Sequence, residues 1–390
     1  TALRDALRRP IGSPALRERV RPSDTVVIVF SDITRPMPND RVLPVLLAEL
    51  EDAGVPREQI TLLNGTGTHR VNTPAELEEM LGADVVARYR VAQHNAFRPE
   101  DMVDIGEMPT GRRARVNRIF QEASFRIVTG FIEPHIFAGF SGGPKGICPG
   151  IAAIDVIMAN HGYDMLNHEH ATWGHTRGNP IWEEMSACAR LARPDFLLNV
   201  TLNARREITG VFAGELWEAH ARGVEFVRRT AMVGVEAPFD VVLTTNSGYP
   251  LDINLYQSVK GISSAAQVVK QGGSIVIATE CRDGIPDYGE YGNLVREGGT
   301  PDGILRIISQ PGFHRHDQWE AQLHADLLNK AEIHVYSDGL SDRQIEEMLL
   351  HPSHDVEETV AALLRRHGPG ARLCVLPEGP QTIPYVRNGR

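Results

Sequence analysis

The sequence of 390 residues is poor in lysine, because only four of its 40 basic residues are lysines: Lys145, Lys260, Lys270 and Lys330. Arginine stays charged in proteins, whereas a lysine amine can lose its proton and form covalent bonds. A lysine that persists against this bias is a candidate for a role that arginine cannot fill. The alternative for each of the four is an ordinary surface position.

Cysteine is equally scarce and long hydrophobic runs are missing. No apolar run reaches the roughly 18 residues that a transmembrane helix needs, and the start TALRDALRRP lacks the apolar core of a signal peptide. The net charge of -10 disfavours nucleic acid and anionic lipid as partners. We expect a soluble, cytoplasmic protein that binds neither nucleic acid nor a membrane. No C-x-x-C pair occurs among the four cysteines, which indicates neither a disulfide framework nor a thiolate zinc site: Cys148, Cys188, Cys281 and Cys374.

The first half of the sequence alternates apolar strands with amphipathic helices. Strands are predicted at residues 25–30, 60–63 and 126–130, and helices between them at 40–53 and 73–81. Each of these strands ends in a polar loop. Such alternation predicts an α/β fold with mainly parallel sheets, in which ligands bind at the carboxyl ends of the strands.

The second half repeats this alternation. Strands are predicted at 239–245, 274–279, 332–336 and 372–376, with helices between them and a crossover between domains at 232–238. We therefore predict two α/β domains, with the active site in the cleft between them. The first, residues 1–235, binds a cofactor, and the second, residues 236–390, contributes substrate contacts. Whether the last residues return to the first domain is left open.

Two loops of the first domain carry candidate functional groups. In SDITRP, Arg35 could clamp a carboxylate through its planar guanidinium while Asp32 orients it; the alternative is an ion pair that stabilises a turn. In GTGTHR, His69 could act as a general base, or serve as a hydrogen-bonded structural histidine. Neither motif decides between its two interpretations.

The richest stretch runs from residue 133 to 150 and contains SGGPKG. Ser141, Gly142 and Gly143 indicate a hydroxyl and backbone amides gathered around a phosphate. Lys145 does not belong to a P-loop, because proline precedes it and glycine follows it where that motif needs glycine and Ser or Thr. Covalent attachment of a cofactor is one alternative role. His161, after the helical pattern IAAIDVIMAN, could bind a metal or cap a helix.

The second domain contributes YQSVKG. Gln257 and Lys260 are three residues apart at a helix start, so both side chains leave one face of that helix. Trp319 offers an aromatic wall, or packs in the core. A histidine group also resembles a metal site, but its spacing matches no standard motif and favours a polar loop: His168, His170 and His175.

Taken together, SDITRP, GTGTHR, EPH, the lysine of SGGPK, ANH and YQSVKG resemble the nickel-pincer-nucleotide lactate racemase family in order and spacing. The resemblance covers nearly the whole chain. Relative to that family, the chain starts at Thr1 inside the first helix, so a preceding strand region of relatives is expected to be missing.

The resemblance implies a 2-hydroxy acid racemase or epimerase that removes a hydride from the substrate, forms a 2-keto acid and returns the hydride to the opposite face. The resemblance implies as cofactor a nickel pyridinium bisthiocarboxylic acid mononucleotide, which separate maturation enzymes would make. An oligomer is left open, as is the identity of the hydroxy acid: lactate, malate, a larger acid or a sugar acid.

The resemblance also implies a role for each residue. Lys145 would attach the cofactor, Ser141, Gly142 and Gly143 would hold its phosphate, and His161 would bind nickel. The remaining assignments concern the substrate: His69 and His135 as the two acid/base residues, Asp32 as the partner of His69, and Arg35, Tyr256, Gln257, Lys260 and Trp319 as substrate contacts.

Two other functions remain as alternatives. A nicotinamide-dependent 2-hydroxy acid dehydrogenase would need a G-x-G-x-x-G turn, and GTGTHR lacks the third glycine. A protein that only binds the nickel nucleotide would have no need for two bases beside a carboxylate clamp.

Overall fold

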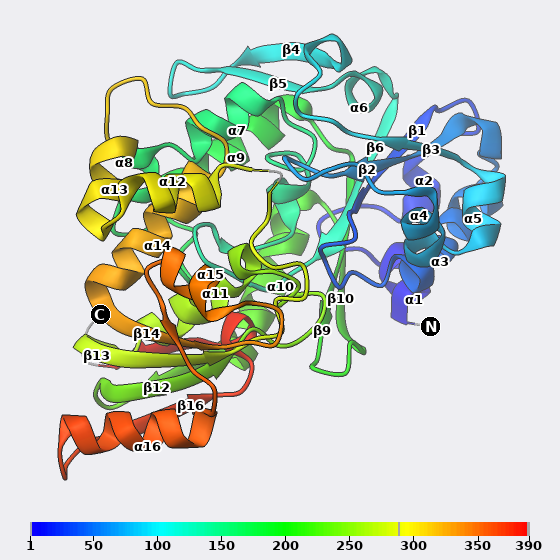
Figure 1. Cartoon of the computed structure of the whole chain (residues 1–390). Coiled ribbons are helices and arrows are strands. Elements are labelled where there is room, and N and C mark those ends of the chain that lie inside the picture. Colours follow the sequence, from blue (N-terminus) through cyan, green and yellow to red (C-terminus); the bar gives the residue numbers. More distant parts are fainter. Residues whose placement is uncertain (1, 288, 388–390) are drawn as a thin grey trace. The chain divides into compact units, whose positions relative to one another are not determined.

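The computed structural model describes residues 2–287 and 289–387, and its chain divides into two compact units (Figure 1). The first unit comprises the chain up to Glu133 together with Phe140–Asn160 and His175–Arg229. The second comprises Pro134–Gly139, His161–Gly174 and the chain from Thr230 onward. Each unit is described by itself. Within the described residues, no helix is long and apolar enough to cross a membrane.

The first unit is built on a six-stranded sheet in the order β10-β9-β6-β1-β2-β3. All neighbours are parallel except β9 and β10, which are antiparallel. The strands are β1 (Val26–Ser31), β2 (Ile60–Gly65), β3 (Arg90–Gln93), β6 (Phe125–Phe131), β9 (Phe196–Leu202) and β10 (Ile208–Gly214). A separate antiparallel pair is formed by β4 (Met102–Glu107) and β5 (Arg113–Asn117).

Both faces of this sheet are buried. Val26, Ile28 and Phe30 of β1 pack in the main core with residues of the first five helices. The alternate residue Val29 lies beside Val128 of β6, and this second face is covered by the stretch around Gly146. Burial on both faces explains why the strands are apolar throughout. The helices are α1 (Ala2–Arg8), α2 (Leu16–Arg19), α3 (Asn39–Asp52), α4 (Pro74–Leu81), α5 (Ala83–Arg88), α6 (Arg118–Glu122), α7 (Ile154–Asn160), α9 (Pro180–Ala192) and α10 (Leu216–Ala231).

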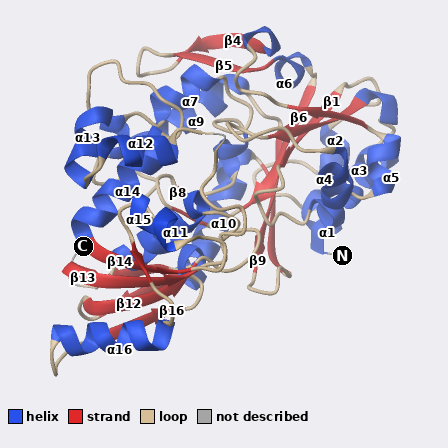
Figure 2. Ribbon diagram, in the orientation of Figure 1, coloured by secondary structure: helices blue, strands red, loops and turns tan. Residues whose placement is uncertain are grey.

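The second unit holds a fully parallel five-stranded sheet in the order β15-β14-β13-β12-β16. Its helices lie on both faces (Figure 2): α16 packs on one face through Val360 and Leu363, and α11 to α14 pack on the other. The strands are β12 (Phe239–Thr245), β13 (Val269–Ala278), β14 (Ala331–Tyr336), β15 (His351–Pro352) and β16 (Leu373–Leu376). The helices are α8 (Tyr163–Leu166), α11 (Leu255–Ala266), α12 (Tyr291–Gly298), α13 (Pro301–Ile308), α14 (Gln318–Lys330), α15 (Asp342–Glu347) and α16 (Val356–His367).

Four short strands complete the chain: β7 (Pro134–His135), β8 (Gly139–Phe140), β11 (Met232–Val235) and β17 (Ile383–Val386). The segment predicted as a crossover at 232–238 therefore contains a strand, β11, which pairs in parallel with β17. The two strands are some 150 residues apart in sequence, so no local sequence pattern could predict that they pair. Both strands belong to the second unit.

The predicted α/β class with mainly parallel sheets in two domains is confirmed. Most predicted elements differ from the observed ones by one or two residues; β12 agrees at both ends. The helix expected between the strands at 239–245 and 274–279 is α11; it ends at Ala266, because the chain turns there into β13, which begins at Val269, before the predicted 274. The amphipathic pattern of the helix thus continues into the first residues of the strand, so the pattern alone does not mark where the helix ends.

Candidate active site

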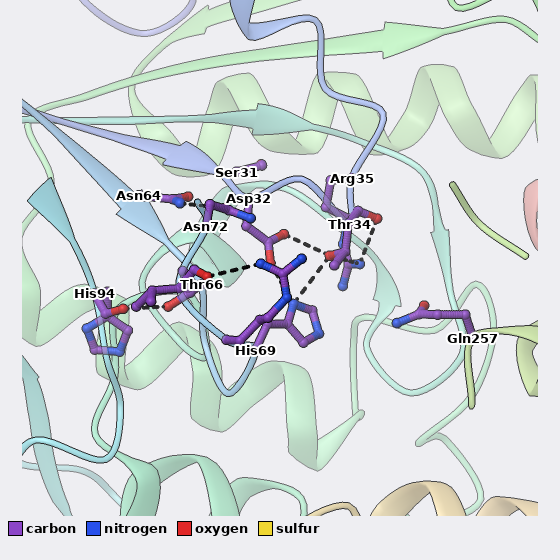
Figure 3. A network of polar contacts seen from close by, with 12 residues as sticks. Ser31, Asp32, Thr34, Arg35, Asn64, Thr66, His69, Asn72, His94 and Gln257 are labelled. Carbon is purple, nitrogen blue, oxygen red and sulfur yellow. Dashed lines mark hydrogen bonds and ion pairs between the residues drawn. The ribbon is translucent and has the colours of Figure 1, made fainter. Parts of the chain in front are cut away.

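The polar loops of the first unit meet at the carboxyl ends of two neighbouring strands. Ser31 and Gly65, the last residues of β1 and β2, lie opposite each other in the parallel register. The next residues of each strand are therefore carried into the same space. This places Asp32 beside His69, with 2.7 Å between Asp32 Oδ2 and His69 Nδ1 (Figure 3).

Thr34 and Arg35 extend this contact (Figure 3). The Thr34 hydroxyl donates to Asp32 Oδ1 over 2.8 Å and accepts from Arg35 Nη1 over 3.0 Å. Arg35 Nη1 also donates to the Thr34 carbonyl oxygen at 3.3 Å. Within the described residues the Nε and Nη2 groups of Arg35 make no hydrogen bond, so they can receive a carboxylate.

Asp32 is ionised although it is buried. Burial alone would raise the pKa of its carboxyl group, but the charge and hydrogen bond of His69, with Arg35 and Thr34, hold the pKa below its ordinary value. The carboxylate accepts from His69, so the ring proton sits on Nδ1 and the lone pair on Nε2. With 25 % of its side chain exposed, His69 presents a basic nitrogen that a ligand can reach.

Buried polar groups hold the loop that carries His69. The backbone amide of His69 donates to the Thr66 carbonyl at 3.0 Å, and the Thr66 hydroxyl donates to the His94 carbonyl at 2.8 Å. The His94 ring lies between Ala152 and Asn117, and burial lowers its pKa to about 4. An imidazole that is neutral near neutral pH therefore supports this loop.

The loop that carries Lys145 is tied to the same place. Gly67 donates its backbone amide to the carbonyl of Gly150 over 3.0 Å, which joins the two loops directly. Lys145 lies partly buried in the 3₁₀ turn Gly143–Gly146. A Cβ on Gly146 would come within 2.4 Å of Val128 Cγ1, so this turn packs directly on the sheet and fixes the lysine backbone.

The polar groups predicted to hold a phosphate are engaged within the protein. The Ser141 hydroxyl donates to the Phe131 carbonyl and accepts from the amide of Glu133. The amide of Gly143 donates to Asn199 Oδ1 over 2.8 Å. The phosphate role of Ser141, Gly142 and Gly143 stays a prediction, while their structural role is evident.

Asn199 and His220 underlie this loop, and the sequence analysis did not single them out. Gly142 and Gly143 both have positive φ, and a Cβ on either would come within 2.6 Å of the Asn199 or the His220 side chain. The His220 Nε2 group donates to the Ser141 carbonyl at 2.9 Å, and burial lowers the pKa of His220 to about 4. The hydrogen bond from the neutral His220 thus holds the loop that contains Ser141 in place.

In the second unit, the rings of His135 and His161 both lie beside that of Phe137. Each histidine ring centroid is 6.3 Å from that of Phe137, and the His161 ring is 5.2 Å from that of Trp319. His135 Nδ1 accepts the amides of Phe137 and Ala138 over 3.2 and 3.1 Å. The proton of a neutral His135 ring therefore sits on Nε2, the opposite tautomer to that of His69.

The helix α11 presents the substrate contacts predicted in the second unit. Asn254 caps this helix, and Lys260 Nζ donates to Gln257 Oε1, as expected for side chains three residues apart. Trp319 Nε1 donates to the Tyr256 hydroxyl over 2.9 Å. The structure thus brings the four predicted residues Tyr256, Gln257, Lys260 and Trp319 into one group of this unit.

Some polar residues of the site were missed by sequence reasoning. Thr34 stands between two residues that were singled out, and its position in the loop is a usable signal. Glu320 follows Trp319 and is 2 % exposed, but nothing in the sequence marks it as buried. The described residues contain no cluster of three or more His, Cys, Asp or Glu that could hold a metal, so the structure does not gather His168, His170 and His175 into one.

Comparison with known proteins agrees with this two-unit α/β architecture. Residues 1–174 match the family model described as the lactate racemase N-terminal domain, and residues 235–383 match the lactate racemase C-terminal domain. The lactate racemase of Thermoanaerobacterium thermosaccharolyticum is 36 % identical over 380 residues, which cover 97 % of this chain and 88 % of that protein. That of Lactiplantibacillus plantarum is 36 % identical over 375 residues, 96 % of this chain and 88 % of its own.

Solved structures give the same result. The lactate racemase apoprotein from Thermoanaerobacterium thermosaccharolyticum superposes with a TM-score of 0.93 at 34 % identity, covering 98 % of this chain and 92 % of that one. A Thermotoga maritima protein at 18 % identity shares the fold, with a TM-score of 0.74 and coverage of 99 % and 97 %. The chain belongs to the lactate racemase family.

The His220→Gln variant tests the neutral histidine below the Lys145 loop. The folded pKa of about 4 lies below the ordinary 6.5, so only the unfolded chain gains a proton as the pH falls from 6.5 to 4, and stability is lost over that window. Glutamine can donate to the Ser141 carbonyl but does not titrate. We expect the wild type to lose about 3 kcal/mol more than H220Q between pH 7 and pH 4 in urea unfolding. Equal losses in both proteins would contradict a neutral buried His220.

Proposed function

We propose that this protein is a 2-hydroxy acid racemase or epimerase that works with a covalently attached nickel-pincer nucleotide. The observation that carries the proposal is the Asp32–His69 pair beside the Thr34–Arg35 contact, at the carboxyl ends of β1 and β2. A general base next to a carboxylate clamp suits a substrate whose hydroxyl group and carboxylate are on adjacent carbons.

The residues present fit the proposed cofactor. Covalent attachment needs an amine, and Lys145 is the first lysine of the chain, with none other before Lys260. A cofactor that brings its own sulfur and carbon donors needs few protein ligands, which agrees with the absence of a three-residue metal cluster among the described residues. His161 would supply the protein's ligand to nickel, and Lys145 the covalent link. When bound, the cofactor supplies the hydride acceptor and donor of the reaction.

The chain's own residues account for the proton transfers. Arg35 binds the substrate carboxylate, which orients the hydroxyl group toward His69. His69 takes the hydroxyl proton at Nε2, and Asp32 stabilises the imidazolium that forms. His135 would act as the second acid/base group: in its imidazolium form it returns a proton to the oxygen of the planar 2-keto acid and is left as a neutral imidazole.

A racemase of this kind needs one group that starts as a base and one that starts as an acid. His69 suits the base, with its proton on Nδ1 and its lone pair on Nε2, and His135 must then start as the imidazolium. After one conversion the two states are exchanged, so each histidine is ready for the reverse conversion. Tyr256, Gln257, Lys260 and Trp319 would contact the substrate from the second unit.

The attachment of the cofactor is tested by Lys145→Arg. We expect protein made together with the cofactor-producing enzymes to carry the nucleotide on a peptide containing Lys145, as measured by mass spectrometry. In K145R both adduct and nickel should be lost, because arginine keeps the charge but not the reactive amine.

The matched control is Lys270→Arg, since Lys270 is an exposed partner of Asp240. K270R should retain adduct and racemisation at wild-type levels. Chiral chromatography, which measures the racemisation of each acid in a panel of 2-hydroxy acids, then identifies the substrate. Adduct without any racemisation would favour a protein that only binds the nucleotide, and turnover that depends on added NAD would favour a dehydrogenase.

Replacing Asp32 by Asn tests the His69 base. The variant keeps the shape of the side chain and removes the charge that stabilises the imidazolium, so kcat should fall on the order of 100-fold or more with little change in cofactor content. Asp40→Asn, at an exposed position of α3, is the control and should keep its rate. An Asp32→Asn enzyme with wild-type kcat would remove His69 from its proposed role.

A further inference from the structure

The loop that carries His69 is closed by two buried asparagines. Asn64 lies near the end of β2, and Asn72 lies just before α4. Asn64 Nδ2 donates to Asn72 Oδ1 over 2.7 Å, which joins the two ends of the loop (Figure 3). Asn64 is 0 % and Asn72 4 % exposed, so opening this hydrogen bond would leave buried polar groups without partners, at a cost in free energy.

Gln93, the last residue of β3, ties the same end of the loop to the sheet. The parallel pairing of β3 with β2 sets Gln93 opposite Asn64. The Gln93 side chain binds the backbone of Asn72 in both directions: Oε1 accepts from the amide over 2.6 Å, and Nε2 donates to the carbonyl oxygen over 2.8 Å. Oε1 also accepts from Asn64 Nδ2 over 3.3 Å. We call Asn64, Asn72 and Gln93 the amide clasp.

The amide clasp acts on the part of the loop that follows His69. The part before His69 has a support of its own, the hydrogen bond from the Gly67 amide to the Gly150 carbonyl oxygen. After His69 the chain runs along the surface, where Val71 is 46 % exposed. The amide clasp therefore returns the chain to a buried attachment within three residues of His69.

Glu76 connects the amide clasp to the first turn of α4. Its Oε2 atom accepts from Asn72 Nδ2 over 3.2 Å and from the Thr73 amide over 2.7 Å. Hydrogen bonds from Arg70, Thr73 and Asn72 outweigh the effect of burial and lower the pKa of this carboxyl group to about 2. Glu76 therefore stays ionised at neutral and alkaline pH, and its contact with Asn72 does not change over that range.

We propose that Gln93 is a positioning residue for His69, because it holds Asn72 against the sheet and so keeps His69 Nδ1 facing Asp32 and Nε2 available to a ligand. The proposal rests on the proposed function only for the role of His69 as a base. Asp32 and His69 come from separate loops, so their contact of 2.7 Å needs both loops to be held in place. The amide clasp provides this for the loop of His69.

Nitrogen NMR of the His69 ring tests the amide clasp without cofactor or substrate. Gln93→Met keeps the length of the side chain but loses both hydrogen bonds to Asn72. At about pH 9, well above the ordinary histidine pKa of about 6.5, the wild type should show a protonated Nδ1 and an unprotonated Nε2. In Q93M the ring should become a mixture of both tautomers, which shifts both nitrogen resonances. His69→Gln assigns these resonances among those of the 15 histidines.

The matched control is Gln310→Met. It removes a side-chain hydrogen bond from an exposed glutamine to the Arg306 carbonyl oxygen, just after α13 in the second unit. The His69 resonances should not change in Q310M. A less stable Q93M that keeps the wild-type tautomer would show that the amide clasp is only structural and would overturn the proposal, as would an equal shift in Q310M.

Gln93→Glu keeps the proposal testable if Q93M folds poorly. The carboxylate still accepts from the Asn72 amide, but an oxygen replaces the donor and repels the Asn72 carbonyl oxygen. The backbone of Asn72 is then held in one direction only, so we expect the tautomer mixture to appear here too. A folded Q93E protein with the wild-type tautomer would contradict the proposal.

Racemisation by cofactor-loaded Q93M completes the test. If the base is displaced, kcat should fall about tenfold or more. KM should change less than about twofold, because Arg35 on the other loop binds the substrate carboxylate. A tautomer shift in Q93M together with no racemisation by the wild type would refute the proposed function and leave the amide clasp standing. Racemisation by the wild type, with an unchanged tautomer and kcat in Q93M, would refute the positioning role alone.

Discussion

The parallel pairing of β1 with β2 is the constraint on which the candidate site depends. Its register sets Ser31 opposite Gly65, so two loops that are separated by more than 30 residues leave the sheet side by side. Parallel pairing of strands buried on both faces is fixed by the apolar core, because a slip by one residue would turn Val26, Ile28 and Phe30 away from it. The geometry of the Asp32–His69 pair therefore derives from the hydrophobic core.

Neutral buried histidines form a second layer under the functional loops. His94 and His220 each donate Nε2–H to a backbone carbonyl, of Ala152 and of Ser141, and burial holds the pKa of each at about 4. Neither ring is charged near neutral pH, so their hydrogen bonds do not depend on the protonation state of the partly exposed His69. The supporting histidines and the proposed base are thus separated by their environments although all three are imidazoles.

Sequence patterns predicted the strands and the loops that follow them, because apolar runs and glycine-rich turns are local signals. They predicted Asp32, Arg35 and His69, and the structure brings these three together. The support from Asn199 and His220 was out of reach, since it depends on side chains some 60 to 80 residues away from the loop that they hold. Glu320 was missed for the opposite reason: an acidic residue in an amphipathic helix normally faces solvent, and only the folded structure shows that this one is buried.

The hydrogen bond between the Gly67 amide and the Gly150 carbonyl links the loop of His69 to the loop of Lys145. Because backbone atoms make it, substitution of side chains cannot remove it, whereas a change of loop length can. An insertion in either loop would shift one functional side chain relative to the other. The distance between these two loops is therefore constrained by their lengths more than by the identity of their side chains.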